Sequence, residues 1–431
     1  MVLFLLYAWI CVGRPQEIVP QLIVLRLGLL TGGLALLAWL HAPGRFAEKV
    51  SLDTPLVRDV MILVGLSVIT LPISIWPVHI FLFLINVFLK TILLFFLVIY
   101  WCRTIQDVRR LLWVYCLGSV SLVIPGVLSG HAGQERYSLE SLSYDANDIA
   151  LLQVMALPLI LYLYSTSGRR AGLVLAGMAT LCLYGIILTQ SRGGFLALLV
   201  VGGLIISRSS MSRSAKWRIV ALGAVVFGVL AGTAWKERIL TMWDPQTEYD
   251  QTAGGRTDLW KASLVLLAKR PWGVGVDNFV TAEGLSHGGS GKWSAPHNTF
   301  LQIGVELGVV GLAIFLRLLA RTLRSLRLIK ISIKPPMLPV VMRRLPERQP
   351  RAPARELDES GHLYQLAEAL EMTLYGFIVA GFFLSHAYSA MLYIMLALGL
   401  VFTRLAKLAD VSTEPLWRRV PKTALNEARM P

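Results

Sequence analysis

The stretch IFLFLINVFLKTILLFFLVIYW, residues 80–101, decides the class of this protein, because a single charge, Lys90, occurs in it. An α-helix needs about 20 predominantly apolar residues to cross a bilayer. Residues 171–189 and 219–234 repeat the pattern with no charged side chain. Hydrophobic residues make up 55% of the 431 residues and charged residues only 16%, against about 25% charged in an average soluble domain. The composition therefore predicts a membrane protein that crosses the bilayer several times.

Apolar runs bounded by charges predict an all-α polytopic fold with about twelve transmembrane helices. The expected spans lie near residues 1–12, 18–40, 58–76, 80–101, 111–128, 148–164, 171–189, 194–206, 219–235, 298–316, 371–385 and 387–403. The first span is too short for a full crossing, because twelve helical residues extend about 18 Å. Nine spans within residues 1–235 would precede a larger, partly helical loop at 236–297. The tenth span would precede a basic, Pro-rich loop at 317–370, and a tail would follow residue 403.

The distribution of basic residues predicts the orientation. With the N-terminus inside, the inner loops and the tail hold 29 of the 41 Lys and Arg residues, and the outer segments hold ten. Short cytoplasmic loops carry an excess of positive charge, so both termini are expected in the cytoplasm and the loop 236–297 outside.

Two general features of the composition exclude other classes. The formal net charge is +15, and the basic run 317–355, interrupted by prolines, is expected to lie against anionic lipid headgroups. Nucleic-acid binding is the rival interpretation, but the run has no interleaved aromatic residues and no binding fold beside it. The four cysteines lie in or beside apolar runs without metal-ligand spacing, so they are expected to be small apolar residues.

The first polar motif on the predicted outer face is Gln190-Ser191-Arg192-Gly193-Gly194, between two apolar spans. Only a tight turn can join the spans here, and glycines permit backbone conformations closed to other residues. Arg192 with exposed N–H groups around it would bind an anion. The alternative is an arginine that extends from a helix end to the membrane surface.

A second motif, Gly254–Trp260, leads into a predicted amphipathic helix on which Trp260, Leu264 and Leu267 recur at helical spacing. Arg256 lies in its first turn. A guanidinium group beside a helix N-terminus suits a phosphate. The alternative is a solvated arginine paired with Asp258.

The third motif, Pro296–Gln302, places His297 at the outer mouth of a span, where Asn298 or Thr299 can cap the following helix. The unperturbed pKa of histidine is about 6.5, which suits a general base near neutral pH. A lone histidine in this position is more often an interfacial hydrogen-bonding group. Two arginines predicted on the same face favour the catalytic interpretation.

In their order along the chain, these motifs resemble the O-antigen ligase and polymerase superfamily of bacterial inner-membrane glycosyltransferases. The resemblance also includes Pro271–Gly275 and Glu306–Gly308, and it is closest over residues 120–320. Two further segments match patterns of the family, Arg14–Glu17 and Tyr144–Asp148.

The resemblance implies an inner-membrane enzyme whose active site faces the periplasm. It would move a glycan from undecaprenyl pyrophosphate to the lipid A–core oligosaccharide, with no metal or other cofactor. His297 would be the general base, and Arg192, Arg256 and Arg136 would bind the pyrophosphate. Three lesser candidates, expected to orient groups or to cap helices, are Asp145, Asn147 and Glu306.

Three alternative functions stay open at this point. An O-antigen polymerase and a protein O-oligosaccharyltransferase of the same superfamily would share these motifs. A lipid-linked glycan flippase or transporter belongs to a different class, and it would need a polar pathway through the membrane that the predicted spans hardly offer.

Cysteine labelling or reporter fusions test the predicted orientation. We expect residue 280 outside the cytoplasm and residues 212 and 350 inside, because the basic loops are retained there. If residues 280 and 350 were found on the same side, both the twelve-span arrangement and the outer active site would be wrong.

Overall fold

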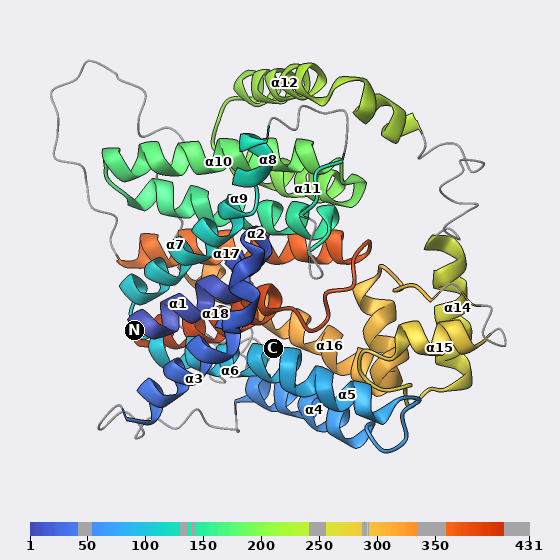
Figure 1. Ribbon diagram of the computed structural model, residues 1–431. Coiled ribbons are helices and arrows are strands. Elements are labelled where there is room, and N and C mark those ends of the chain that lie inside the picture. Colours follow the sequence, from blue (N-terminus) through green and yellow to red (C-terminus); the bar gives the residue numbers. More distant parts are fainter. Residues whose placement is uncertain are drawn as a thin grey trace, which may run out of the picture.

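A computed structural model of the protein describes residues 1–41, 54–129, 136–139, 144–240, 256–286, 291, 293–333 and 359–408. Within these ranges the chain forms helices joined by loops, and no strand occurs in them. The expected all-α fold is therefore confirmed. Most helices lie side by side in one bundle, with α12 (Arg213–Leu240) along one edge (Figure 1).

The described part of residues 1–189 contains twelve helical segments. They are α1 (Val2–Gly13), α2 (Pro15–Ile18), the 3₁₀-helix η1 (Pro20–Leu25), α3 (Leu27–Leu40), α4 (Pro55–Ile69), α5 (Pro77–Phe83), the π-helix η3 (Leu84–Phe88), α6 (Leu89–Trp101), α7 (Ile105–Ser121), α8 (Ile124–Leu128), α9 (Ala146–Thr166) and α10 (Arg169–Thr189). After these come α11 (Arg192–Arg208), α12, α14 (Arg256–Lys269), α15 (Phe279–Ser286), α16 (Thr299–Ser332), α17 (Glu359–Gly381) and α18 (Ala390–Leu408).

Six helical stretches of the described chain are long and apolar enough to cross a membrane. They are Pro77–Trp101, Ile105–Leu128, Ala146–Thr166, Arg169–Thr189, Thr299–Ser332 and Ala390–Leu408. Each contains most of one predicted span, so the protein has the composition of a multi-pass membrane protein. The number twelve and the orientation in the membrane stay predictions.

Two expected segments differ from the observed helices. The span predicted at 18–40 is interrupted, because η1 ends at Leu25 and Arg26 takes a left-handed conformation (φ 43°) before α3 begins. The basic loop expected from residue 317 was wrong for its first part, since α16 continues to Ser332. The predicted loop also includes the start of α17, which is helical from Glu359 onward. Residues 334–358 of this loop lie outside the described residues.

Buried carboxylates explain why the basic end of α16 stays helical. Asp59 of α4 is fully buried and pairs with Arg317 and Arg321. Glu371 of α17 lies 2.5 Å from Lys330 and also pairs with Arg327. A buried charge is tolerated only when it is paired, so these cations fasten α16 to its neighbours.

The centre of the bundle is α9, whose side chains are buried along nearly its full length. A helix that is buried all round belongs to the interior of a protein. The helices α7, α10, α11 and α17 pack around it (Figure 1). Because α9 begins at the site described below, its packing holds that end of the bundle in place.

A break in α16 at Gly308 joins this helix to the loop that follows α14. Gly308 has φ 73° and ψ −174°, which is not helical. The freed backbone groups pair with the loop: Val309 N donates to Pro271 O at 2.9 Å, and Gly275 N donates to Glu306 O at 2.9 Å. A Cβ on Gly308 would lie 2.2 Å from Pro271 O. Only glycine therefore fits here, and two sequence motifs more than 30 residues apart form one junction.

Replacing Gly308 by alanine tests this junction. The backbone conformation alone costs a non-glycine residue about 1–3 kcal/mol, and the collision with Pro271 adds to it. We expect Gly308→Ala to lower the free energy of unfolding by about 3 kcal/mol or more. The purified variant should therefore melt at a lower temperature than the wild type. The matched control is Gly33→Ala in α3, where a Cβ meets no atom within 4 Å. A Gly308→Ala protein as stable as this control would contradict the proposed role of the junction.

Candidate active site

The segments that join the helices at one end of the bundle surround a cavity of about 370 Å³. The end of α1, the start of α9, the loop after α14, the start of α16 and the α17–α18 loop all contribute to it; α14 and α15 lie at this end, on the right of Figure 1. Its ionisable lining residues are Arg14, Asp145, Asp148, Asp277, His297 and His386, with Tyr144 and Tyr388. The cavity thus brings together two histidines and three carboxylates from distant parts of the chain.

His297 is held by the residues on either side of it. Its backbone is left-handed (φ 45°), and Trp260 of α14 donates its indole N–H to Pro296 O at 3.0 Å. Asn298 caps α16, because its Oδ1 accepts from the backbone N–H groups of Phe300 and Leu301 at 3.0 Å. The predicted cap is therefore confirmed, with Asn298 as the capping residue, and His297 directly before it lines the cavity.

The surroundings of His297 favour its neutral form. Burial lowers the pKa of His297 below the ordinary value of 6.5, and the positive charge of Arg256 lowers it further. The carboxylates of Asp145 and Asp148 act in the opposite direction. A neutral imidazole near pH 7 can accept a proton, as a general base must.

The two principal arginine candidates belong to segments that approach one aromatic side chain, Phe383. The Arg256 guanidinium carbon lies 6.0 Å from the centre of the Phe383 ring. A Cβ on Gly193, next to Arg192, would lie 2.9 Å from Cβ of Phe383. Neither arginine is among the described residues that line the cavity of His297. Arg192 and Arg256 lie at the starts of α11 and α14, respectively.

The turn before α11 is tight, but its glycines have a different purpose from the one expected. Gln190, and neither of the glycines, takes the left-handed conformation (φ 49°). Gly193 and Gly194 instead allow close packing, since a Cβ on Gly194 would lie 2.5 Å from Cβ of Ala150 in α9. Ser191 Oγ accepts from Gly194 N at 3.1 Å. That N–H is therefore already paired and is not one of the exposed N–H groups expected around Arg192.

Hydrogen bonds connect the remaining outer candidates to this turn. Arg136 Nε donates to Thr189 O at 3.2 Å. Ser191 Oγ donates to Asn147 Oδ1 at 2.8 Å, and Asn147 Nδ2 donates to Asp145 Oδ2 at 3.0 Å. Asp145 is the N-cap of α9. The network fixes the α10–α11 turn against the start of α9.

Glu306 lies two residues before the break in α16 and is 1% exposed. Its backbone carbonyl accepts from Gly275, and its side chain is not among the described groups that line the cavity. The structure therefore brings Glu306 to the junction of α16 with the Pro271–Gly275 loop, beneath the site.

Sequence reasoning missed a histidine–aspartate pair in the cavity. His386 Nε2 lies 2.7 Å from Asp148 Oδ1, and both side chains are largely buried. Thr299 Oγ1 accepts from His386 N at 3.1 Å and donates to Leu384 O at 2.7 Å, which ties the α17–α18 loop to the start of α16. Asp148 ends the quoted Tyr144–Asp148 motif, and His386 follows a predicted span directly. An ionisable residue in that position was the available signal.

Asp277 and Arg14 were also absent from the predicted site. Burial raises the pKa of the Asp277 carboxyl, although His79, whose Nε2 lies 2.9 Å from Asp277 Oδ2, opposes the effect. Arg14 pairs with Glu17 at 2.9 Å and stacks on Tyr144 at 4.2 Å from the ring centre. Only the structure brings these residues, 263 positions apart, to one cavity.

Unusual backbone conformations gather at this end of the molecule. Within the described part of the chain, the non-glycine residues with positive φ are Arg14, Arg26, Gln190, Asp277, Trp293 and His297. Three of them line the cavity. Such conformations cost about 1–3 kcal/mol each and persist where the surrounding structure enforces them, typically at functional sites. No group of three or more His, Cys, Asp or Glu side chains in the described residues could hold a metal ion.

Comparisons with known proteins agree with the family resemblance inferred from the sequence motifs. Residues 177–316 match the family model described as O-antigen ligase. A protein of Rickettsia felis (strain ATCC VR-1525 / URRWXCal2) named "Putative polysaccharide ligase" is 26% identical over 196 residues. That alignment covers 42% of this chain and 46% of the relative, so the chain spans less than half of the relative's length in the match.

The matched region contains Arg192, Arg256, His297 and Glu306, whereas Arg136, Asp145 and Asn147 lie before it. The match at 177–316 and the relative therefore confirm that this chain resembles the O-antigen ligase superfamily.

Proposed function

We propose that this protein is an O-antigen ligase of the bacterial inner membrane, with its active site on the periplasmic face. It would transfer a glycan from undecaprenyl pyrophosphate to the lipid A–core oligosaccharide. The family match at 177–316 supports a glycosyl-transferring membrane enzyme. The observation that carries the mechanism is His297, which lines a cavity together with Arg14 and whose pKa is lowered by burial and by the charge of Arg256.

The proposed reaction is a direct displacement at the anomeric carbon of the donor sugar. The acceptor hydroxyl oxygen forms the new bond as the bond from that carbon to the pyrophosphate oxygen breaks, which inverts the configuration. His297 takes the proton of the acceptor hydroxyl. Undecaprenyl pyrophosphate leaves as an anion from the opposite face of the sugar.

Cations must balance the negative charge that develops on the leaving pyrophosphate. In this proposal Arg192 and Arg256 bind it from the starts of α11 and α14, and Arg136 adds positive charge from the segment before α9. The planar fork of arginine matches phosphate oxygens in a bidentate manner. Asp145, Asn147 and Glu306 would act by holding the helix starts and the α16 junction.

The His386–Asp148 pair would orient the acceptor rather than accept its proton. The carboxylate fixes the ring of His386 through Nε2, as a carboxylate orients histidine in other sites. His386 and His297 line the same cavity, so a sugar hydroxyl between them could bond to both. This division of roles makes the two histidines comparable in one experiment.

Acceptor identity separates the proposal from its relatives. A polymerase would transfer to a second lipid-linked repeat, and a protein O-oligosaccharyltransferase to a polypeptide. Transfer to purified lipid A–core, with the other acceptors unused, supports the ligase. A flippase would instead move the lipid-linked glycan across vesicles without forming a glycosidic bond.

Substituting His297 tests the proposed general base. With purified protein, lipid-linked glycan and lipid A–core in detergent, we expect His297→Ala to lower the transfer rate about 10²–10⁴-fold. His297→Gln should be nearly as damaging, because glutamine forms hydrogen bonds but does not accept the proton. In the same assay, Arg192→Lys should lose much of the rate, since the charge is kept and the planar fork is lost.

The controls for this assay are two other histidines. His41→Gln, at the exposed end of α3, should behave as wild type, and His386→Gln should lower the rate less than His297→Gln does. If His386→Gln were the more damaging change, the base would be His386. Near-normal turnover by a folded His297→Gln protein would exclude His297 from proton transfer.

The pH profile provides a second test of the same residue. Because burial and Arg256 lower the pKa of His297, kcat/KM should rise with pH through a midpoint below 6.5, where the imidazolium loses its proton. Removing the charge in Arg256→Gln should move this midpoint upward, although the rate itself falls. Lys261→Gln, an exposed cation one turn along α14, should leave the midpoint unchanged. A midpoint that does not respond to Arg256 would contradict the electrostatic coupling.

A further inference from the structure

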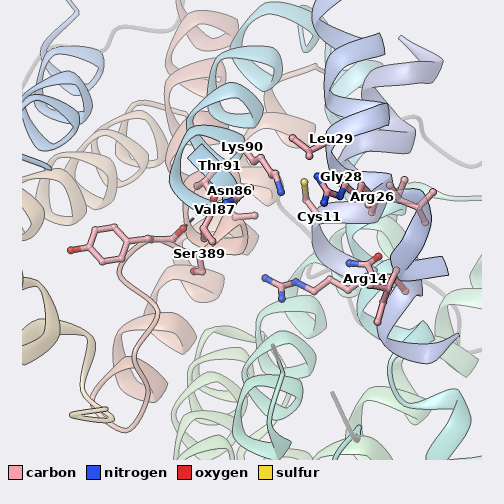
Figure 2. Close-up of a pocket in the computed structure, with 16 residues that line it drawn as sticks. Cys11, Arg14, Arg26, Gly28, Leu29, Asn86, Val87, Lys90, Thr91 and Ser389 are labelled. Carbon is pink, nitrogen blue, oxygen red and sulfur yellow. Dashed lines mark hydrogen bonds between the residues drawn. The ribbon is translucent and has the colours of Figure 1, made fainter. Parts of the chain in front are cut away.

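A second cavity, of about 520 Å³, adjoins the first between the N-terminal segment and α6. The two cavities share four lining residues, Arg14, Val87, Tyr388 and Ser389. Its other walls come from η1, the start of α3, η3 and α6 (Figure 2). Its described lining residues do not include the three arginines proposed to bind the pyrophosphate, which are Arg192, Arg256 and Arg136.

Three cations from different elements face this second cavity. Arg14 follows α1, Arg26 precedes α3, and Lys90 lies in the first turn of α6; Figure 2 shows their nitrogen atoms directed into the space between these elements. No Asp or Glu occurs among the described residues that line it. Arg14 pairs with Glu17, but in the described structure no carboxylate lies within 4.0 Å of Arg26 or Lys90. Within the part of the chain that the structure describes, the positive charges of Arg26 and Lys90 are therefore uncompensated.

The start of α3 adds to this positive potential. Leu27 and Gly28, its first two residues, line the cavity, and the helix has no side-chain cap. The N-terminus of a helix carries a partial positive charge and favours anions. Lys90 nevertheless lies against it, since a Cβ on Gly28 would be 4.0 Å from Lys90 Cδ. Cations at a positive helix end repel each other unless an anion lies between them.

The backbone around the cavity is held in uncommon conformations. Arg14 (φ 40°) and Arg26 (φ 43°) are both left-handed. The π-helix η3 ends directly before α6, and its residues Asn86 and Val87 line the cavity. Strained residues and π-turns occur preferentially at functional sites. These distortions bring all three cations to one place.

The rim of the cavity suits the acyl or prenyl chain of a lipid. Ile23, Leu29 and Val87 line it and are 56%, 43% and 40% exposed. Within the wall, Gln16 has a buried amide oxygen without a hydrogen-bond partner among the described residues. That oxygen can accept from a hydroxyl group of a ligand. A free phosphate ion would satisfy the cations but not the apolar rim.

We propose that the cavity between Arg14, Arg26 and Lys90 binds the phosphate group of a membrane lipid, as a second phosphate site beside the cavity of His297. Two sources share this chemistry, a phospholipid headgroup and the phosphate of a polyprenyl carrier. The proposal depends on binding alone and does not require that the protein transfers glycans.

Binding of short-chain lipids to the purified protein in neutral detergent tests the proposal. The probes are dioctanoyl phosphatidylglycerol, farnesyl pyrophosphate, inorganic pyrophosphate and uncharged dioctanoylglycerol, measured by native mass spectrometry or thermophoresis. We expect at least one of the two phosphate lipids to bind more tightly than either pyrophosphate alone or the uncharged lipid. The tighter of the two identifies the source.

The variant Arg26→Gln/Lys90→Gln should weaken that binding about tenfold or more, because charge-assisted hydrogen bonds are lost. Lys90→Arg keeps the charge and should retain binding, which separates loss of the site from loss of folding. Lys407→Gln, on an exposed cation in the last turn of α18, should bind as wild type does. Equal binding by the double variant, or equal binding of inorganic pyrophosphate or dioctanoylglycerol, would overturn the proposal. The binding assay measures no turnover. A negative result in it would therefore leave the proposed glycan transfer untouched, and a negative transfer assay would leave this binding site untouched.

Discussion

The break in α16 at Gly308 is the constraint on which the site depends. A helix interrupted inside a bundle leaves backbone groups that must find partners, because no water is available there to satisfy them. The Pro271–Gly275 loop supplies them, from Val309 N to Pro271 O and from Gly275 N to Glu306 O. This pairing fixes the loop that carries Asp277 and, through α14, the Trp260 contact to Pro296. His297 is thus positioned from both sides by one junction.

The charged side chains at the two ends of the bundle differ in how they are paired. Far along α16 and α11 from the site, Asp59 and Glu371 are buried and surrounded by basic side chains, so positive and negative charges compensate each other. At the site end, cations and carboxylates line cavities, and three of the lining residues, Arg14, Asp277 and His297, have left-handed backbone conformations. Compensated charge stabilises packing, whereas charge exposed to a cavity is available for a ligand.

The two adjoining cavities differ in the charged groups that line them. One cavity carries histidines and carboxylates, and the other carries only cations among its described charged residues. Arg14 belongs to both and is stacked on Tyr144. A charged ligand in one cavity would therefore change the electrostatic potential in the other. Arg14 transmits this change, because it lines both cavities and its backbone is held in a left-handed conformation.

Hydrophobic runs by themselves determined the class of this protein, since apolar segments such as 80–101 have no stable place outside a helix in a membrane. Local chemistry also determined the cap at Asn298 and the helix that begins at Arg256. Only the tertiary structure decided which polar groups meet. No periodicity in the sequence relates Asp148 to His386, which form the pair in the first cavity. The same holds for the three cations of the second cavity, Arg14, Arg26 and Lys90. Their meeting follows from how helices of different length and direction pack, as does the close approach of α11 to α9 that requires Gly194. Spacing along the chain reports helices, but contacts between helix ends depend on packing of the whole bundle.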